Sequence, residues 1–540
     1  KAKMRKLTGS PHVLFPVGDE GDRLRSFQAA LKNGKITGDF PLYFCDSCKK
    51  EMVYRKCEEC GGECKQTYFC RFCGNMEKDK CAHGEGYRYK KRGIDINYFF
   101  EKTIRRLGMV VYPDLIKGVR GTANKHRVME HLAKGVLRAK HSVCVNKDGT
   151  TRYDCTELPI THFKPKEIHT SIEKLKELGY DKDIKGKDLT DLDQILELLP
   201  QDIILPGSDY LEESAIKVLG RVTKFVDELL EKFYGLKGFY NLEKKEDLVG
   251  HLVIGLAPHI SAGLIGRIIG YSETQGLLAH PMWHAGLRRD CDGDESAVML
   301  LVDALLNFSR SYLPESRGAK TMDSPLVLTA MLYPAEVDDQ VHGLDVVWRY
   351  PLELYEAALE YKYPWDVNVE QLGSRLKTEK QYEDMGFTHG INNFNHGITC
   401  SAYKTLPTMS EKLFGQMEIA QRVRAVDKED VAKLIIQKHF IKDIKGNLRK
   451  FSMQQFRCVG CNEKYKRPPL LGKCLNCGGK LIFTITEGSV VKYLEASLTL
   501  ARDYDFSPYL KQSLYVVKDQ IEGVFGKEKD KQVGLGEFFG

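Results

Sequence analysis

Cysteine spacing constrains the fold of this chain more than any other feature, because eleven of its sixteen cysteines stand in three tight groups and Cys64 lies between two of these groups. Two groups each combine a pair of Cys-x2-Cys turns, and their members are Cys45, Cys48, Cys57 and Cys60, then Cys458, Cys461, Cys474 and Cys477. One such turn aims two sulfurs at a point, and two turns complete a tetrahedral Zn²⁺ site. Glycine pairs follow both sets at 61–62 and 478–479, where the backbone must bend freely. We therefore expect a zinc-ribbon module at each place.

The remaining group supplies three thiolates and one imidazole, from Cys70, Cys73, Cys81 and His83. Cys64 is a competing fourth ligand, because it follows Cys60 by only four residues. We favour His83 and regard Cys64 as the leftover thiol. Closed four-ligand sites contribute folding energy and leave no open position for chemistry, so all three zinc ions are expected to be structural.

Composition indicates a soluble protein of several domains in a reducing compartment. A chain of 540 residues is too long for one core. Its residues are 42% hydrophobic and 29% charged, a composition that suits a soluble globular protein. The sequence has no apolar run of about 18 residues, so it predicts no membrane span, and no secretory signal is evident. Clustered thiols then favour a cytoplasmic location, with the isolated Cys144, Cys155 and Cys400 as small buried apolar residues. The net charge of +7 is only weak evidence for nucleic acid.

Local patterns predict several elements. We expect strands at 13–17 and leading into residue 44, and helices at 22–31, 208–234 and 428–438. Residues 251–345 alternate short apolar runs with Gly and Pro, which predicts a compact β-rich unit with one helix near 296–308.

Aspartates recur at every second position in one short segment, as Asp290, Asp292 and Asp294. Alternate side chains of an extended segment share a face, so the three carboxylates crowd together. Such like charges repel unless a cation lies between them, and an all-oxygen set suits Mg²⁺ or Mn²⁺. Gly293 permits the bend that brings two carboxylates onto one ion. The pattern predicts a divalent-metal site.

Other interpretations of this segment fit less well. An EF-hand needs Gly at position six and Glu at position twelve, and counting from Asp290 neither is in place. A solvated acidic turn is the commoner fate of such a string. However, Arg288 and Arg289 precede it and an apolar helix predicted over 297–306 follows it, which favours the edge of a packed core.

Two further motifs are weak or missing. His280 and His284 have the i,i+4 spacing of zinc ligands, but the glutamate of a zinc-protease helix is absent and Pro281 disfavours a helix through His280. The sequence has no Gly-x4-Gly-Lys-Ser/Thr phosphate loop, which argues against an ATP-driven motor.

The surroundings of the acidic segment resemble a known family. The matching motifs are Ala257-Pro-His-Ile-Ser-Ala-Gly263, Gly266-Arg-Ile-Ile-Gly270, Leu278-Ala-His-Pro-Met-Trp-His284, Asp303-Ala-Leu-Leu-Asn-Phe-Ser-Arg310, Asp323-Ser-Pro-Leu-Val-Leu328, Asp345-Val-Val-Trp348 and Gly446-Asn-Leu-Arg449. With the Asp290-Cys-Asp-Gly-Asp294 string, these resemble the C-terminal portion of the large, catalytic subunit of the archaeal family D DNA polymerase. The resemblance runs from about residue 13 to the C-terminus.

The resemblance implies a mixed α+β, multidomain fold. Its catalytic core is of the two-barrel polymerase type, in which double-psi β-barrels carry the metal-binding aspartates, as in multisubunit RNA polymerases. The family's catalytic pair maps onto Asp292 and Asp294. The family usually has Asn where this chain has Asp290, and Asp290 restores the three-aspartate spacing of RNA polymerases. Because the large subunit normally extends well upstream, we expect the other barrel to lie outside this chain.

Together the patterns and the resemblance predict seven regions. These are a basic start with strands joining the upstream barrel (1–44), tandem zinc modules (45–90), a mixed and helical DNA-binding region (91–250), a catalytic double-psi barrel core with the acidic loop (251–345), a mixed α/β region (346–450), a C-terminal zinc module (451–490), and a helical segment with a clamp-binding tail (491–540).

The implied activity is DNA-templated transfer of a nucleotide from a dNTP to a primer 3′-hydroxyl by two Mg²⁺ or Mn²⁺ ions, bound by Asp292 and Asp294. Charge and proximity in sequence suggest phosphate contacts for six basic residues, Lys117, Arg120, Lys125, Arg267, Arg288 and Arg289. Each alone is more often a surface charge, and only the set suits a polymerase.

The last residues resemble the box that binds the sliding clamp PCNA, through Gln532, Leu535, Phe538 and Phe539. A frayed terminus with chance aromatics is the plainer alternative. Expected partners are primer-template DNA, dNTPs, the clamp and the family's small exonuclease subunit, in a cytoplasmic, nucleoid-associated setting without membrane attachment.

Two other functions remain open. Asp290 suggests an RNA polymerase-like nucleotidyltransferase, which assays with dNTPs against rNTPs would separate from a DNA polymerase. A non-catalytic zinc-ribbon scaffold for DNA and clamp is the alternative of a different class, and it would lose nothing when Asp292 and Asp294 become Ala.

Overall fold

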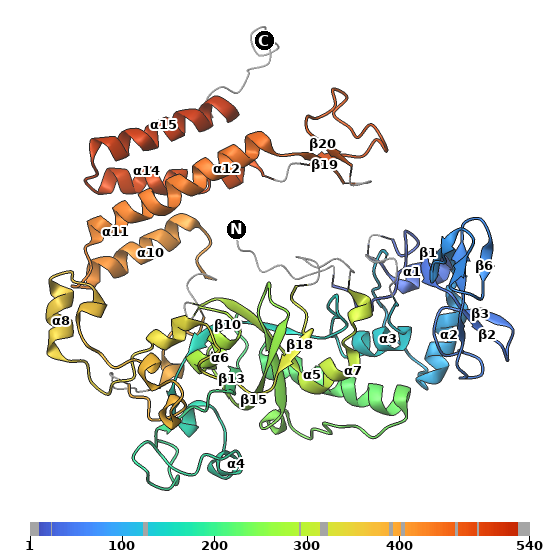
Figure 1. The fold of residues 1–540 in the computed structure, drawn as a ribbon, viewed down its shortest axis with the longest axis horizontal. Helices are drawn as coiled ribbons and strands as arrows, with labels where there is room; N and C mark the ends of the chain where they lie inside the picture. The colour runs from blue at the N-terminus through green and yellow to red at the C-terminus, as the bar shows by residue number, and fades with distance from the viewer. Residues whose placement is uncertain are drawn as a thin grey trace, which may run out of the picture. The chain divides into compact units, whose positions relative to one another are not determined.

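The computed structural model describes residues 10–22, 24–121, 128–290, 293–313, 322–387, 393–400, 405–459, 463–482 and 485–526 (Figure 1). Two compact units divide the chain. The barrel unit comprises Met4–Tyr350 and Val369–Cys400, and the helical unit comprises Pro351–Asn368 and Ser401–Gly540 with Lys1–Lys3. Within the described part of the chain, no helix combines the length and apolarity needed to cross a lipid bilayer.

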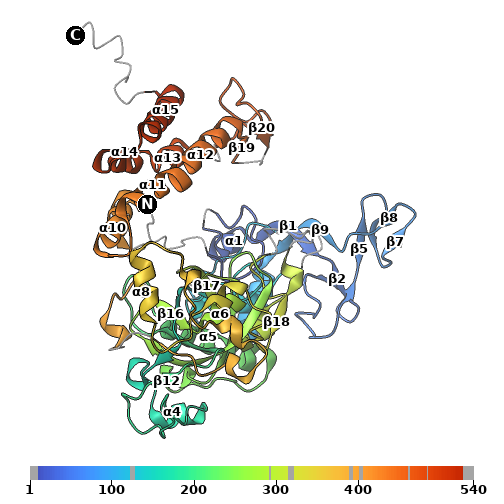
Figure 2. The ribbon, with the colours of Figure 1, turned by 60° about the vertical axis from the view of Figure 1, so that its left-hand side comes forward.

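The barrel unit begins with an antiparallel pair, β1 (Lys35–Pro41) and β9 (Tyr89–Asp95), and the cysteine-rich modules are inserted between these two strands. In Figure 2 the modules project beyond the β1–β9 pair. The strands of the modules are β2 (Tyr43–Cys45), β3 (Lys50–Met52), β4 (Lys65–Gln66), β5 (Tyr68–Cys70), β6 (Gly74–Met76), β7 (Lys80–Cys81) and β8 (Gly84–Glu85). The predicted strand leading into residue 44 is therefore two strands, β1 and β2.

Helices α1 (Phe27–Asn33) and α2 (Ile96–Arg106) pack against β1, and α3 (Leu132–Lys140) packs against α2. Helix α1 starts at the N-cap Ser26 and ends at Gly34, whose φ of +70° suits glycine. It begins later than the predicted helix at 22–31. The predicted strand at 13–17 is buried but not a ladder strand, since only Pro16 forms a bridge, to Val119. Proline lacks the N–H that a regular ladder requires.

A closed ring of six strands forms the centre of the barrel unit. Its members are β10 (Tyr153–Pro159), β13 (Asp202–Pro206), β14 (Leu252–Leu256), β15 (Ala262–Ser272), β16 (Gly276–Ala279) and β17 (Glu295–Leu300). The order around the ring is β13-β16-β10-β17-β14-β15 and back to β13. The pairs β10–β16 and β13–β15 are parallel, and the other four pairs are antiparallel. Closure leaves the backbone groups of these strands paired on both sides.

Further elements surround the ring. Helix α5 (Ala215–Glu228) continues into a π-helical turn at Leu229–Tyr234 and packs against β10, β13 and β17. This confirms the predicted helix from Ala215 onward. The other regular elements are β11 (His162–Phe163), β12 (Leu196–Glu197), α4 (Ile172–Glu177) and β18 (Val327–Thr329), which pairs with β15. Short 3-10 turns lie at Pro165–Glu167, Lys245–Leu248, Arg310–Tyr312, Asp339–Gly343, Leu372–Arg375, Glu379–Gln381 and Phe394–His396.

Helix α6 (Pro281–Gly286) carries the largest fully buried side chain, Trp283. Two glycines make room for its indole. A Cβ on Gly255 would lie 2.5 Å from Trp283 Cζ2, and a Cβ on Gly266 would lie 2.5 Å from Cη2. These glycines stand on the neighbouring antiparallel strands β14 and β15, so the tryptophan packs directly on the backbone of the ring.

The apolar run predicted as one helix over 296–308 forms two elements. Its first part is strand β17, and only Leu301–Asn307 forms a helix, α7. Every residue from 296 to 300 is buried, because β17 pairs with β10 on one side and β14 on the other. A strand buried on both faces lacks the alternation that distinguishes it from a buried helix.

The helical unit contains α8 (Leu352–Leu359), a 3-10 turn at Pro364–Asp366, α10 (Met409–Arg422), α11 (Lys428–Leu434), a π-helical turn at Ile435–Phe440, α12 (Ile441–Met453), α13 (Glu487–Val491), α14 (Leu494–Asp503) and α15 (Pro508–Phe525). The predicted helix at 428–438 is confirmed and continues into α12. The hydrophobic core of the helical unit includes Leu510, Leu514, Val517 and Ile521 of α15, which recur at helical spacing. Between α12 and α13 lie the strands of the C-terminal ribbon, β19 (Phe456–Cys458), β20 (Lys464–Tyr465) and β21 (Leu481–Ile482).

Candidate metal centres and acidic loop

Three clusters of thiol and imidazole groups form where the sequence predicts them. In the first, the sulfurs of Cys45, Cys48, Cys57 and Cys60 all lie within 4.8 Å of one another. In the C-terminal ribbon, Cys458, Cys474 and Cys477 meet the same limit, while Cys461 lies outside the described residues. Both sets can hold one metal ion. Gly61 and Gly478 adopt φ near +70°, as expected for glycines that follow such turns.

The second cluster decides the place of Cys64. The ligand atoms of Cys70, Cys73, Cys81 and His83 lie within 4.8 Å of one another, and Nδ1 of His83 is 3.2 Å from Cys73 Sγ. Cys64 instead packs with Cys45, Met52 and Cys57 in the core of the first module. Geometry therefore favours His83 as the fourth group of the second cluster.

The isolated cysteines differ in their exposure to solvent. Cys155 and Cys400 are buried, as predicted, but Cys144 is exposed. Its neighbours Val143 and Val145 are both buried, so alternation along the extended segment turns Cys144 outward.

The acidic loop joins α6 to β17 beside strand β10. Asp294 is partly buried, and its carboxylate oxygen Oδ2 lies 3.2 Å from Arg289 Nη1. The carbonyl of Asp294 accepts a 2.8 Å hydrogen bond from the backbone N–H of Glu157. Gly293 has a φ of +98°, a conformation that glycine permits. Asp290 is exposed, and Asp292 lies outside the described residues.

A fully buried pair lies behind the loop. Nδ1 of His284 is 3.3 Å from a carboxylate oxygen of Glu157, and both side chains have no exposed surface. The other imidazole nitrogen of His284 lies 3.2 Å from the carbonyl of Leu158. The backbone N–H of Arg289 donates to the carbonyl of His284 at 3.0 Å. Strand β10 is therefore linked to both ends of the segment that carries the aspartates.

His280 caps the N-terminus of helix α6. Pro281 is the first residue of α6, and Nδ1 of the N-cap His280 accepts the backbone N–H of Met282 at 3.1 Å. Burial, with His284 and His162 nearby, lowers the pKa of His280 to about 3, so its ring is neutral. The histidine pair thus takes part in capping and packing, and His280 Nε2 contacts Met385 Sδ at 3.2 Å.

A pocket of about 210 Å³ adjoins the acidic loop. Asp154 of β10, Glu295 of β17 and Asp323 line it together with Arg152. Arg152 Nη2 is 2.6 Å from a carboxylate oxygen of the fully buried Asp148 and also donates to the carbonyl of Asp323. Sequence reasoning did not single out Asp154, Arg152 or Glu157, and only Asp323 had a signal, as the first residue of a recognised motif.

The basic residues proposed as phosphate contacts lie in different settings. Arg267 forms two 2.8 Å hydrogen bonds with the buried carboxylate of Asp202, and Arg289 pairs with Asp294. Arg120 and Arg288 are exposed and Lys117 is half-buried. Lys125 and the tail residues Gln532, Leu535, Phe538 and Phe539 lie outside the described residues. Among the described members of this set, Arg288 and Arg289 adjoin the acidic loop in the sequence, and Arg289 contacts Asp294.

Comparison with models of known protein families assigns the chain to a family. The model of the DNA polymerase II large subunit DP2 catalytic domain matches residues 109–412, which include the whole six-stranded ring and the acidic loop. The chain belongs to the DNA polymerase II large-subunit family. The model of the DP2 central domain also matches residues 1–79, which include the first cysteine cluster. Membership confirms the resemblance to family D large subunits.

Relatives in the DNA polymerase II large-subunit family agree along the chain. The large subunit of Archaeoglobus fulgidus is 47% identical over 100% of this chain and 48% of its own length. That of Nanoarchaeum equitans is 46% identical over 98% of this chain and 46% of its own length, and that of Pyrococcus furiosus is 46% identical over 97% and 42%. The chain therefore spans about half the length, or less, of the curated relatives it matches.

Proposed function

We propose that this chain carries the catalytic centre of a template-directed DNA polymerase and that Asp292 and Asp294 anchor its divalent ions. One observation carries the proposal. Asp294 stands directly before β17 of the closed barrel and its carbonyl is held by β10, within the region that matches the DP2 catalytic domain. Substrates would be primer-template DNA and dNTPs, and the names of the relatives support this reaction.

The donor set suits Mg²⁺ or Mn²⁺. Carboxylate oxygens are the ligands that these hard cations prefer, and the Asp294 main chain is already held in place by Glu157. When bound, the ions lower the pKa of the primer 3′-hydroxyl and neutralise the pyrophosphate leaving group. Asp294 would exchange its contact with Arg289 for a contact with an ion. Arg289 would then be available to a phosphate oxygen, with the exposed Arg288 beside it.

The barrel type and the remaining partners are part of the same proposal. The ring of six strands with two parallel pairs is compatible with a double-psi barrel. A second barrel, the small exonuclease subunit and the sliding clamp would complete the replicative enzyme, with the clamp held by Gln532, Leu535, Phe538 and Phe539. The three cysteine clusters would each hold a structural Zn²⁺.

Aspartate substitutions in the assembled large subunit with its small subunit test the proposal. Asp292→Asn and Asp294→Asn should each reduce primer extension with dNTPs at least 100-fold and weaken Mn²⁺ binding, measured by electron paramagnetic resonance. Asp339→Asn is the matched control, because Asp339 is an exposed aspartate that lies outside the acidic loop. Unchanged extension by both loop variants would favour the non-catalytic scaffold.

Asp290 favours one alternative function, an RNA polymerase-like activity, which the same extension assay can test. Because it restores a third aspartate at the spacing found in RNA polymerases, the wild type and Asp290→Asn should be compared with dNTPs and with rNTPs. A DNA polymerase extends with dNTPs in both proteins. Extension with rNTPs that depends on Asp290 would instead identify an RNA polymerase-like nucleotidyltransferase.

A further inference from the structure

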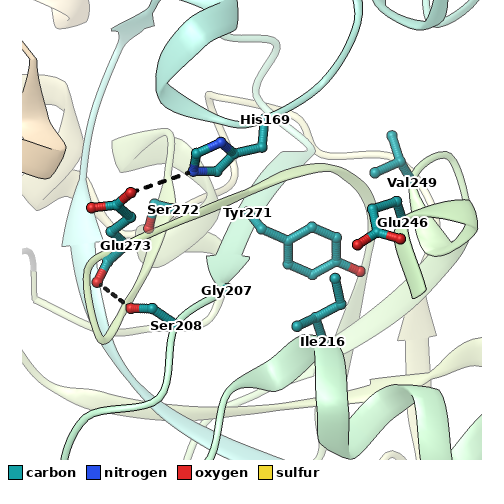
Figure 3. Close-up of a pocket in the computed structure, with 9 residues that line it drawn as sticks. All are labelled: His169, Gly207, Ser208, Ile216, Glu246, Val249, Tyr271, Ser272 and Glu273. Carbon is teal, nitrogen blue, oxygen red and sulfur yellow. Dashed lines mark hydrogen bonds and ion pairs between the residues drawn. The ribbon is translucent and has the colours of Figure 1, made fainter. Parts of the chain in front are cut away.

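A second pocket, of about 260 Å³, lies in the barrel unit where β13 and β15 end (Figure 3). Its wall includes His169, Ser208, Ile216, Glu246, Tyr271 and Glu273. None of these residues belongs to the acidic loop or to a cysteine cluster. The volume falls below the roughly 300–1,000 Å³ of pockets for drug-sized ligands, so it suits a small molecule.

The hydroxyl of Tyr271 indicates that the pocket is built to receive a ligand. Tyr271 is only 4% exposed, and its buried hydroxyl has no hydrogen-bond partner among the described residues. Leaving such a group unsatisfied costs about 1–3 kcal/mol. Burial raises the pKa of Tyr271, so the group stays a neutral phenol that can both donate and accept. Figure 3 shows the hydroxyl directed toward the side of the pocket where Glu246 lies.

The charge of the lining favours a cation. Glu246 and Glu273 are its two carboxylates, and none of the described residues that line the pocket is Lys or Arg. The two carboxylates lie on opposite sides of Tyr271 in Figure 3. Ile216 and Val249 supply an apolar part of the wall, on the Glu246 side of Tyr271 in Figure 3. A ligand that fits this lining carries two positive charges and a hydrocarbon portion.

The backbone holds His169 at the Glu273 end in an uncommon conformation. Its φ is +55°, in the left-handed region that non-glycine residues seldom adopt. The neighbours on both sides are fixed to β15, since Ile168 accepts the Tyr271 N–H at 3.0 Å and Thr170 donates to the Ile269 carbonyl at 2.7 Å. His169 Nε2 lies 3.9 Å from a carboxylate oxygen of Glu273 (Figure 3). Strain of this kind often marks a functional site.

We propose that this pocket binds a protonated aliphatic diamine or polyamine. One ammonium group would donate to Glu246 and to the phenol oxygen of Tyr271, whose own proton is then directed at Glu246. The other ammonium would donate to Glu273, and the methylene chain would lie against Ile216 and Val249. The inference stands apart from the proposed polymerase activity.

Calorimetric titration of the full 540-residue chain with four probes tests the ligand class. Putrescine and spermidine should bind saturably, n-butylamine at least five-fold more weakly, and 1,4-butanediol not at all. The same ammonium group could also come from a lysine of another protein, and Nα-acetyl-lysine methylamide represents that source. Equal affinity for putrescine and the lysine probe, or no binding of either diamine or polyamine, would overturn the proposal.

Two variants locate the site. Tyr271→Phe removes only a hydroxyl that has no partner among the described residues, so the fold should persist with unchanged thermal unfolding, while putrescine affinity falls at least five-fold. Glu246→Gln should weaken binding similarly. Glu243→Gln is the control, because Glu243 is an exposed neighbour that does not line the pocket.

A third variant excludes the acidic loop as the binding site. Asp294→Asn should bind putrescine as the wild type does, because that loop lies outside this pocket. If Tyr271→Phe and Glu246→Gln both retained wild-type affinity, the cation would be bound elsewhere and the assignment would be wrong.

Discussion

His284 Nδ1 and a carboxylate oxygen of Glu157 face each other at 3.3 Å with both side chains fully buried. On its other side, the imidazole faces the carbonyl of Leu158 at 3.2 Å. Carboxylate and carbonyl oxygens are both acceptors. Through these two contacts the His284 ring joins α6 to β10.

Glu157→Ala should destabilise the barrel unit by about 3–5 kcal/mol, because it leaves a buried imidazole nitrogen without its partner. Glu157→Gln keeps a side-chain oxygen and an N–H at the same place, so it should cost less. Urea unfolding monitored by tryptophan fluorescence measures both effects. Wild-type stability of Glu157→Ala would contradict this role.

Gly266→Ala should destabilise the ring by overpacking. Its Cβ would lie 2.5 Å from two ring carbons of Trp283, and such overpacking typically costs about 1–3 kcal/mol. Gly343→Ala is the control, because no atom of the described residues lies within 4 Å of a Cβ there. Thermal unfolding reports the difference. In a Trp283→Phe background, which removes the crowded ring carbons, Gly266→Ala should cost less than in the wild type, and an equal cost would refute the contact.

Glu130→Gln should be strongly destabilising. Arg138 and Glu130 form a fully buried two-bond ion pair with distances of 3.0 and 2.9 Å, and Arg138 also donates to the carbonyls of His12 and Gly149. Removing one charge leaves the other buried and unpaired, at a cost of about 3–5 kcal/mol. Denaturant unfolding measures the loss.

An exposed pair supplies the comparison for this variant. Lys174 and Glu177 lie 2.9 Å apart on the surface, so Glu177→Ala should leave the unfolding midpoint unchanged. Similar losses from Glu130→Gln and Glu177→Ala would mean that burial does not set the strength of the Arg138 pair.

Stability of the barrel unit should fall as the pH drops from 6.5 toward 3. Burial lowers the pKa of His280 to about 3 in the folded chain, whereas in the unfolded chain it is ordinary, near 6.5. Between these values the unfolded chain binds a proton that the folded chain does not, and stability declines by up to about 1.4 kcal/mol per pH unit. His280→Asn keeps a capping oxygen but cannot titrate, so urea midpoints between pH 7 and 5 should decline less steeply. Identical slopes would contradict this.

Zinc stoichiometry should separate Cys64 from His83. Because Cys64 packs inside the first module while His83 completes the second cluster, Cys64→Ser should retain the metal content of the wild type. His83→Ala should lose one ion or release it faster to a chromogenic chelator. Metal analysis of the purified variants measures both. The opposite pattern would make Cys64 the ligand.

The cysteine clusters could be predicted from the sequence because their ligands are local, with each pair set by one tight turn. The ring could be predicted only in part. Strands β10 and β13 join it from residues 153–159 and 202–206, and no local pattern shows that they pair with β16 and β15. Likewise, β17 and α7 form one apolar run whose division depends on strand neighbours distant in the sequence.

The aspartates of the acidic loop stand out in the sequence, but the contacts that support the loop do not. Alternating aspartates have a distinctive pattern, whereas Glu157 and His284 look like ordinary polar residues until the fold brings them together. The same holds for Tyr271, whose unpartnered hydroxyl is a property of packing. Sequence reasoning therefore predicts the chemical groups more readily than the contacts that hold them.

The insertion of residues 42–88 between β1 and β9 has a consequence for how the protein folds. Pairing these strands closes a long loop, and the entropic cost of closure depends on the length of flexible chain between the ends. Metal binding would collapse the intervening modules into compact bodies first and so shorten that flexible chain. Zinc supply during synthesis would then control the rate at which the N-terminal hairpin forms, and a zinc-starved nascent chain would expose the edges of β1 and β9 to aggregation.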